Sequence, residues 1–132
     1  MAHVPYANTI ECLTYAMICT KPDIAHAVSV VSKFMANSGK VHWNVIKWIL
    51  QYLKGTKDFS IKFRRSSGVE ELEGFVDVDY AGDLDNRRST TGFIFMLFGE
   101  PMRWWCSLQR TMTLFTIEAE YMAMSEASKE SF

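Results

Sequence analysis

Hydrophobic side chains recur every three or four residues through the first 55 positions, which is the spacing of amphipathic helices. The pattern predicts three helices: residues 6–18, a segment from Pro22 to just before Asn37, and residues 41–54 with Gly55 as C-terminal cap. The second helix carries one apolar stripe, which consists of Ile24, Ala27, Val28, Val31, Phe34 and Met35.

After Gly55 the pattern changes to the alternation that is typical of strands. It predicts a short strand at 60–63 and longer strands at 72–80, 90–98 and 102–108, the last two joined by Gly99–Pro101. Residues 117–130 are rich in Ala, Glu and Met and predict a helix with Thr116 as N-cap. We expect an α/β chain: a helical segment, 1–66, and then a three-stranded antiparallel sheet with one helix, 67–132. The turn Arg64–Gly68 marks the boundary.

Two acidic side chains share one face of the first long strand. Because side chains alternate across a strand, Asp77 and Asp79 lie on the same side as Phe75, whereas Val76 and Val78 point the other way. Neighbouring carboxylates repel each other, so this arrangement is costly unless it is exposed or neutralised by a cation.

The last helix also carries an unusual acid. Glu120 falls on a stripe with Ile117, Met124 and Ala127, beside Ala123, and Glu118 lies about 200° away around the helix. One interpretation is a glutamate at the helix edge that reaches solvent. The other is a metal ligand that faces the carboxylates of the first strand.

Charge divides the chain in two although the net charge is only −1. Residues 1–70 hold nine Lys/Arg against four Asp/Glu, and residues 71–132 hold five against eleven. Lys40, Lys47 and Lys54 recur every seven residues on the third helix, with Asn44 and Gln51 between them. This row indicates either contact with nucleic-acid phosphates or an ordinary solvated face.

Composition narrows the classes of protein. Hydrophobic residues make up 48% of the 132 positions, which is enough to bury a core. The three cysteines lack zinc spacing and predict buried reduced thiols. The sequence shows neither a signal peptide nor an apolar run that could span a membrane, so we expect an intracellular protein with no membrane partner.

Several motifs together resemble the Pol polyprotein of copia-type LTR retrotransposons. Asp77–Asp83, then Arg88–Phe93, then Glu118–Ala123 are similar to the opening of its ribonuclease H domain. Upstream, Thr14–Ala16 with Pro22–Ile24, and Lys47–Thr56, resemble the segment between its reverse transcriptase and ribonuclease H.

The resemblance implies a partial ribonuclease H-like fold and a two-metal mechanism. Such enzymes cut the RNA strand of RNA–DNA hybrids with two Mg²⁺ ions held by four carboxylates. Asp77 matches the first carboxylate and Glu120 the second, so both are predicted to be catalytic and to bind metal. Asp79 is a further candidate ligand. The implied partners are an RNA–DNA hybrid or another nucleic acid and the remainder of the Pol polyprotein.

The chain also departs from the family pattern. It ends at Phe132, before the positions of the third and fourth carboxylates. We therefore expect a fragment that does not bind both Mg²⁺ ions and is inactive alone. The alternatives are a non-catalytic nucleic-acid-binding module, which the lysine row favours, or a domesticated fragment that acts through protein contacts at an open strand edge.

Overall fold

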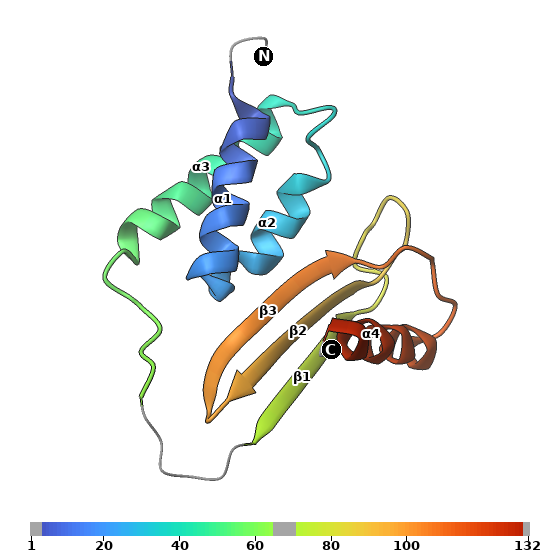
Figure 1. Cartoon of the computed structure of the whole chain (residues 1–132). Helices are drawn as coiled ribbons and strands as arrows, with labels where there is room; N and C mark the ends of the chain where they lie inside the picture. The colour runs from blue at the N-terminus through green and yellow to red at the C-terminus, as the bar shows by residue number, and fades with distance from the viewer. Residues whose placement is uncertain (1–3, 65–70, 131–132) are drawn as a thin grey trace. The chain divides into compact units, whose positions relative to one another are not determined.

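A computed structural model describes residues 4–64 and 71–130 (Figure 1). The chain divides into a helical unit that ends at Lys62 and a sheet unit that begins at Phe63. The predicted boundary at 66/67 and most of the predicted turn fall on residues 65–70, outside the described residues.

The helical unit contains α1 (Tyr6–Cys19), the 3₁₀ turn η1 (Pro22–Ile24), α2 (Ala25–Ser32) and α3 (Lys40–Gly55). The helical spacing of the sequence accounts for its core, because the stripes of the three helices face one another. The buried apolar residues are Tyr6, Ile10, Leu13, Met17, Ile24, Ala25, Val28, Val31, Ile46 and Ile49.

Polar contacts tie the helices of this unit together. The Tyr6 hydroxyl donates to the Val31 carbonyl at 2.9 Å, and burial raises the pKa of Tyr6. Lys21 Nζ donates to the carbonyls of Thr56 and Phe59 at 3.1 and 2.8 Å, which anchors the chain where it leaves α3.

The second helix is shorter than predicted. It ends at Ser32, and the chain continues in turns in which the Phe34 and Met35 amides donate to carbonyls three residues back. The apolar stripe that suggested a longer helix is therefore only partly buried, since Met35 is exposed. The predicted strand at 60–63 is also wrong, because alternation does not make a strand without a partner to pair with.

The sheet unit contains β1 (Leu72–Asp79), β2 (Thr90–Leu97), β3 (Glu100–Leu108) and α4 (Thr116–Glu130). The strands form an antiparallel sheet in the order β1-β2-β3. The β2–β3 connection is Phe98–Gly99 rather than the predicted Gly99–Pro101. Both of its residues have positive φ, 55° and 77°, which is the geometry of a two-residue type I′ turn.

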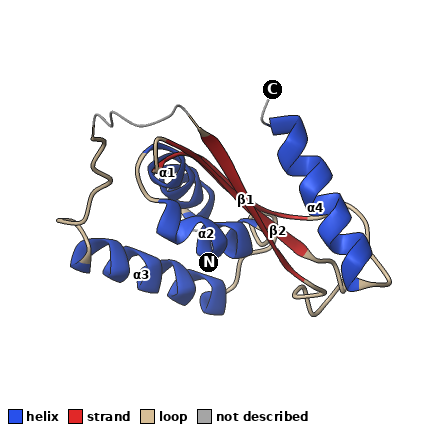
Figure 2. Ribbon diagram, turned by 90° about the horizontal axis from the view of Figure 1, so that it is seen from below, coloured by secondary structure: helices blue, strands red, loops and turns tan. Residues whose placement is uncertain are grey.

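Helix α4 covers one face of this sheet (Figure 2). Two polar contacts show which face of the sheet α4 covers. Gln109, directly after β3, bonds to Thr91 of β2 and to the Ala119 carbonyl of α4, and Arg103 of β3 pairs with Glu130 of α4. Thr91 pairs with Val78 across β1–β2, and Phe95 pairs with Arg103 across β2–β3. Since paired residues share a face, the α4 side of β1 carries Val76 and Val78. An α/β chain with one antiparallel sheet is therefore confirmed.

Candidate metal centre and nucleic-acid surface

The carboxylates of β1 lie on the face of the sheet away from α4. Asp77 pairs with Gly92 and Asp79 with Thr90, which places both opposite Val76 and Val78, as the alternation predicts. Both side chains are exposed, and the Val78 amide donates to Asp77 Oδ1 at 2.9 Å. Asp79 packs so closely on Gly82 that any Cβ at position 82 would collide with its carboxylate. A residue larger than glycine at position 82 would therefore displace the Asp79 carboxylate.

Glu120 lies on α4 outside the buried face of that helix. The buried residues are Ala119, Ala123 and Ala127. The predicted inward stripe is therefore wrong for Ile117 and Met124, which are 78% and 61% exposed, and Glu120 is exposed as well. The physical reason is size: three alanines four residues apart allow the helix backbone to approach the sheet closely, and the larger side chains then point outward.

The structure does not bring these positions together in the described part of the chain. Asp77 and Asp79 occupy one face of the sheet, and Glu120 belongs to the helix on the other. Within residues 4–64 and 71–130, no group of three or more His, Cys, Asp or Glu side chains is arranged to hold a metal ion. The donor set does not fit two Mg²⁺ ions, each of which needs carboxylates that converge on it. The catalytic and metal-binding roles of Asp77, Asp79 and Glu120 stay predictions.

The lysine row lies on the exposed side of α3. Lys40, Lys47 and Lys54 are exposed, as are Asn44 and Gln51 between them, while Ile46 and Ile49 are buried on the opposite side. The sequence of α3 contains no Asp or Glu. Its surface therefore carries a positive field that no acid of the same helix neutralises.

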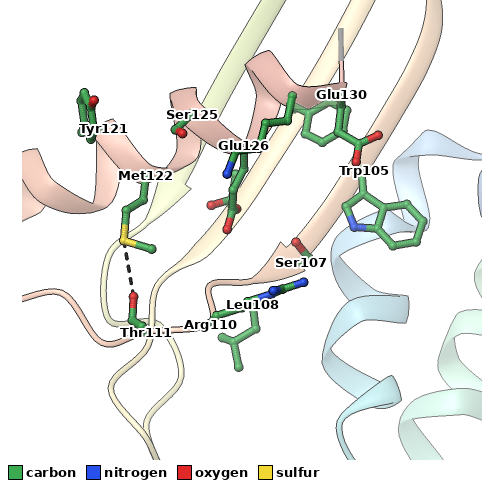
Figure 3. Close-up of a pocket in the computed structure, with 13 residues that line it drawn as sticks. Trp105, Ser107, Leu108, Arg110, Thr111, Tyr121, Met122, Ser125, Glu126 and Glu130 are labelled. Atoms are coloured by element: carbon green, nitrogen blue, oxygen red, sulfur yellow. Dashed lines mark hydrogen bonds between the residues drawn. The ribbon is translucent and has the colours of Figure 1, made fainter. Parts of the chain in front are cut away.

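A cleft of about 700 Å³ separates α4 from the outer part of the sheet (Figure 3). Met122, Ser125 and Glu126 lie on the helix side, and Ser107, Leu108 and Arg110 lie on the strand side. Lys129 and Glu130 also line the cleft, so it carries charges of both signs. Such a lining favours neither cations nor anions.

Gln109 is a buried polar residue whose role the sequence did not reveal. It follows β3 directly and is 0% exposed. Its Nε2 donates to Thr91 Oγ1 and to the Ala119 carbonyl, both at 2.9 Å, so that one side chain joins β2 to α4. The Ala119 carbonyl can only accept, which fixes the amide orientation and leaves Oε1 without a partner among the described residues. The only signal in the sequence was the interruption of an apolar strand at Gln109.

Known proteins resemble this chain over nearly its whole length. This chain is 50% identical over 130 residues to the retrovirus-related Pol polyprotein from transposon TNT 1-94 of Nicotiana tabacum. The matched segment is 98% of this chain but only 10% of that protein. The chain is 34% identical over 125 residues to the corresponding polyprotein from transposon RE2 of Arabidopsis thaliana, of which it covers 8%. The chain thus spans about a tenth of the length of these polyproteins.

A shorter relative is matched almost end to end. The secreted RxLR effector protein 161 of Plasmopara viticola is 41% identical over 131 residues, which are 99% of this chain and 92% of that protein. No family model and no solved structure matches the chain. In the described segments we find no helix with the length and apolar content of a membrane span. The chain therefore belongs to a family of transposon Pol-related sequences that includes the Plasmopara viticola protein and a segment of the plant Pol polyproteins.

Proposed function

We propose that the sheet unit is the opening of a ribonuclease H-type domain from a retrotransposon Pol polyprotein, and that this chain alone does not cleave RNA–DNA hybrids. The proposal is supported by the element order, three antiparallel strands and then a helix, with Asp77 on the first strand and Glu120 on the helix. In the complete domain Asp77 would contribute to an Mg²⁺ site that cuts the RNA strand, and Glu120 would contribute only if its carboxylate reached the Asp77 face of β1.

The proposed lack of cleavage rests on the separation of the Asp77 and Glu120 carboxylates. Asp77 and Glu120 belong to opposite sides of the sheet, and the described residues contain no third acid that converges with either. Hydrolysis by this mechanism needs an ion on each side of the scissile phosphate, and neither ion has a complete set of ligands.

The test is incubation of the full 132-residue chain with a hybrid labelled on its RNA strand, in buffer with Mg²⁺. We expect no cleavage above background, with an authentic ribonuclease H as positive control. Turnover that disappears in Asp77→Asn but persists in Asp85→Asn, an exposed acid in the turn after β1, would contradict the proposal.

A second candidate function is contact with nucleic-acid phosphates through the lysine row of α3. The exposure of Lys40, Lys47 and Lys54 on one side of a helix without acids favours it. Lysine ammonium groups act as point charges on phosphates, and each contact that is formed releases bound counterions.

We therefore expect binding of a labelled oligonucleotide that weakens steeply with salt, measured by fluorescence anisotropy. Lys47→Glu should lower the affinity and reduce the slope of log K against log salt by about one. Lys62→Glu makes the same charge change at an exposed position outside α3 and serves as control. Equal losses of affinity in both variants would show general charge attraction and would rule out a contact specific to the lysine row of α3.

A further inference from the structure

We propose that the exposed face of α3 binds single-stranded nucleic acid, with an unpaired base stacked on Trp48; this inference rests on the proposed phosphate contact of the lysine row. Trp48 is 66% exposed although it is among the largest apolar side chains in the protein. It follows Lys47 directly in α3, so the indole and the ammonium group leave the helix about 100° apart. An aromatic face and a cation are thus presented on one continuous surface.

Three rows of different chemistry run along this surface of α3. Lys40, Lys47 and Lys54 form a row of cations with a spacing of about 10.5 Å along the axis, which is seven residues of helical rise. Asn44 and Gln51 form a middle row of amides, and Trp48 and Tyr52 form the aromatic row. The two amide residues lie four residues before and three residues after Trp48, and are therefore its neighbours on the helix surface. Cations, amides and an aromatic ring suit the phosphates, the base edges and the base faces of a nucleic acid, respectively.

The neighbour of Trp48 on the next turn is held in place. Tyr52 is four residues on, and its hydroxyl donates to Asp23 Oδ2 at 2.6 Å. That hydrogen bond raises the pKa of Tyr52, so the phenol stays neutral over the ordinary pH range. Asp23 is the carboxylate that borders the surface on this side, and we expect it to keep phosphates away from the aromatic row.

The aromatic row selects for a single strand. In a duplex or hybrid each base is stacked between its neighbours, so a protein reaches only base edges and the backbone. An unpaired base exposes its whole face, and stacking on an aromatic side chain stabilises it with little dependence on sequence. The lysine row alone would bind a single strand or a duplex, whereas Trp48 contributes to binding only when the bases are unpaired.

A protein partner is the other class of occupant for an exposed tryptophan, because tryptophan is frequent at binding hot spots. The composition of α3 disfavours it. Lysine is depleted in the cores of protein interfaces, and here a row of three lysines runs beside the tryptophan. Charge complementarity favours a polyanion.

The experiment compares a fluorescently labelled single-stranded 12-mer with a blunt RNA–DNA hybrid of the same sequence, titrated with the full chain at low salt. Trp48→Ala should weaken binding of the single strand about tenfold. It should change binding of the hybrid less than twofold, and Trp48→Phe should retain most of the affinity. Val41→Ala removes another exposed apolar side chain of α3 and should change neither. If Trp48→Ala does not fold by circular dichroism, Trp48→Leu replaces it, since leucine keeps apolar bulk without an aromatic face.

The outcomes separate this inference from the phosphate contact on which it rests. Suppose that the hybrid and the single strand bind equally, that the Trp48 substitutions have no effect, and that Lys47→Glu lowers the affinity. This result would overturn the single-strand inference alone. If neither the single strand nor the hybrid binds, both proposals are overturned. Self-association of the chain that Trp48→Ala abolishes, without nucleic-acid binding, would assign the surface to a protein partner instead.

Discussion

Replacing Gln109 by glutamate should destabilise the sheet unit by about 3 kcal/mol or more at neutral pH, because it buries an unpaired charge in place of an amide. The Nε2 group that donates to Thr91 and to the Ala119 carbonyl would be lost. A carboxylate oxygen would then face the Ala119 carbonyl oxygen, and position 109 is 0% exposed, so water cannot solvate the charge.

This loss should depend on pH in a defined direction. Burial without a cation raises the pKa of the introduced carboxyl above the value of about 4.3 in the unfolded chain. Below pH 4.3 the group is neutral in both states and the penalty is small. As the pH rises above that value, the unfolded state ionises first, so the variant loses about 1.4 kcal/mol per pH unit relative to wild type until the folded pKa is reached.

Hydrogen exchange followed by mass spectrometry measures this effect for each unit separately. Exchange should accelerate in peptides of β1–β3 and α4 and stay unchanged in those of α1–α3. Gln51→Glu is the matched control, since it makes the same substitution at an exposed position. A Gln109→Glu protein as stable at pH 7 as wild type would show that position 109 is not buried as described.

Replacing Ala123 by leucine should destabilise the sheet unit by about 1–3 kcal/mol, through overpacking between α4 and the sheet. Ala123 is 0% exposed and lies in the middle of the alanine row that faces the strands. A leucine there must push the helix away from the sheet, which also strains the bond from Gln109 to the Ala119 carbonyl.

The rotation of α4 about its own axis is tested by the adjacent residue. Met124→Lys should change the urea midpoint of the sheet unit little, because Met124 is exposed and lysine is a good helix former. If the stripe Ile117–Glu120–Met124 faced the sheet instead, lysine at position 124 would bury a charge. A larger loss in Met124→Lys than in Ala123→Leu would therefore reverse the assignment of faces.

The sequence predicted the elements of this fold better than it predicted their orientation. The strands β1 and β2 and the helices α1 and α3 lie within one or two residues of their predicted bounds, because each has a clear apolar period bounded by glycine or polar turns. The segment 60–63 has the same alternation but no strand beside it, and pairing is a tertiary property that a local pattern does not contain.

The candidate site was predictable only in part for a related reason. The lysine row depends on a seven-residue spacing within one helix, so its common exposed face followed from helical geometry alone. The expected proximity of Asp77 and Glu120 depended both on which face of β1 is covered by α4 and on which stripe of α4 faces the sheet. Ile117 and Met124 suggested one stripe by hydrophobicity and the alanines defined another by size, and close packing favoured the smaller side chains.

The acidic strand β1 has a consequence for the chain as a solute. In the described sheet β1 has a neighbour on one side only, β2, and its other edge leaves backbone groups unpaired. Such an edge invites the same edge of another molecule to add to it, which is a common start of aggregation. Glu73, Asp77 and Asp79 place negative charge along this strand, so two copies that approach edge to edge repel each other. Whatever these carboxylates do in a complete domain, in this chain they oppose aggregation.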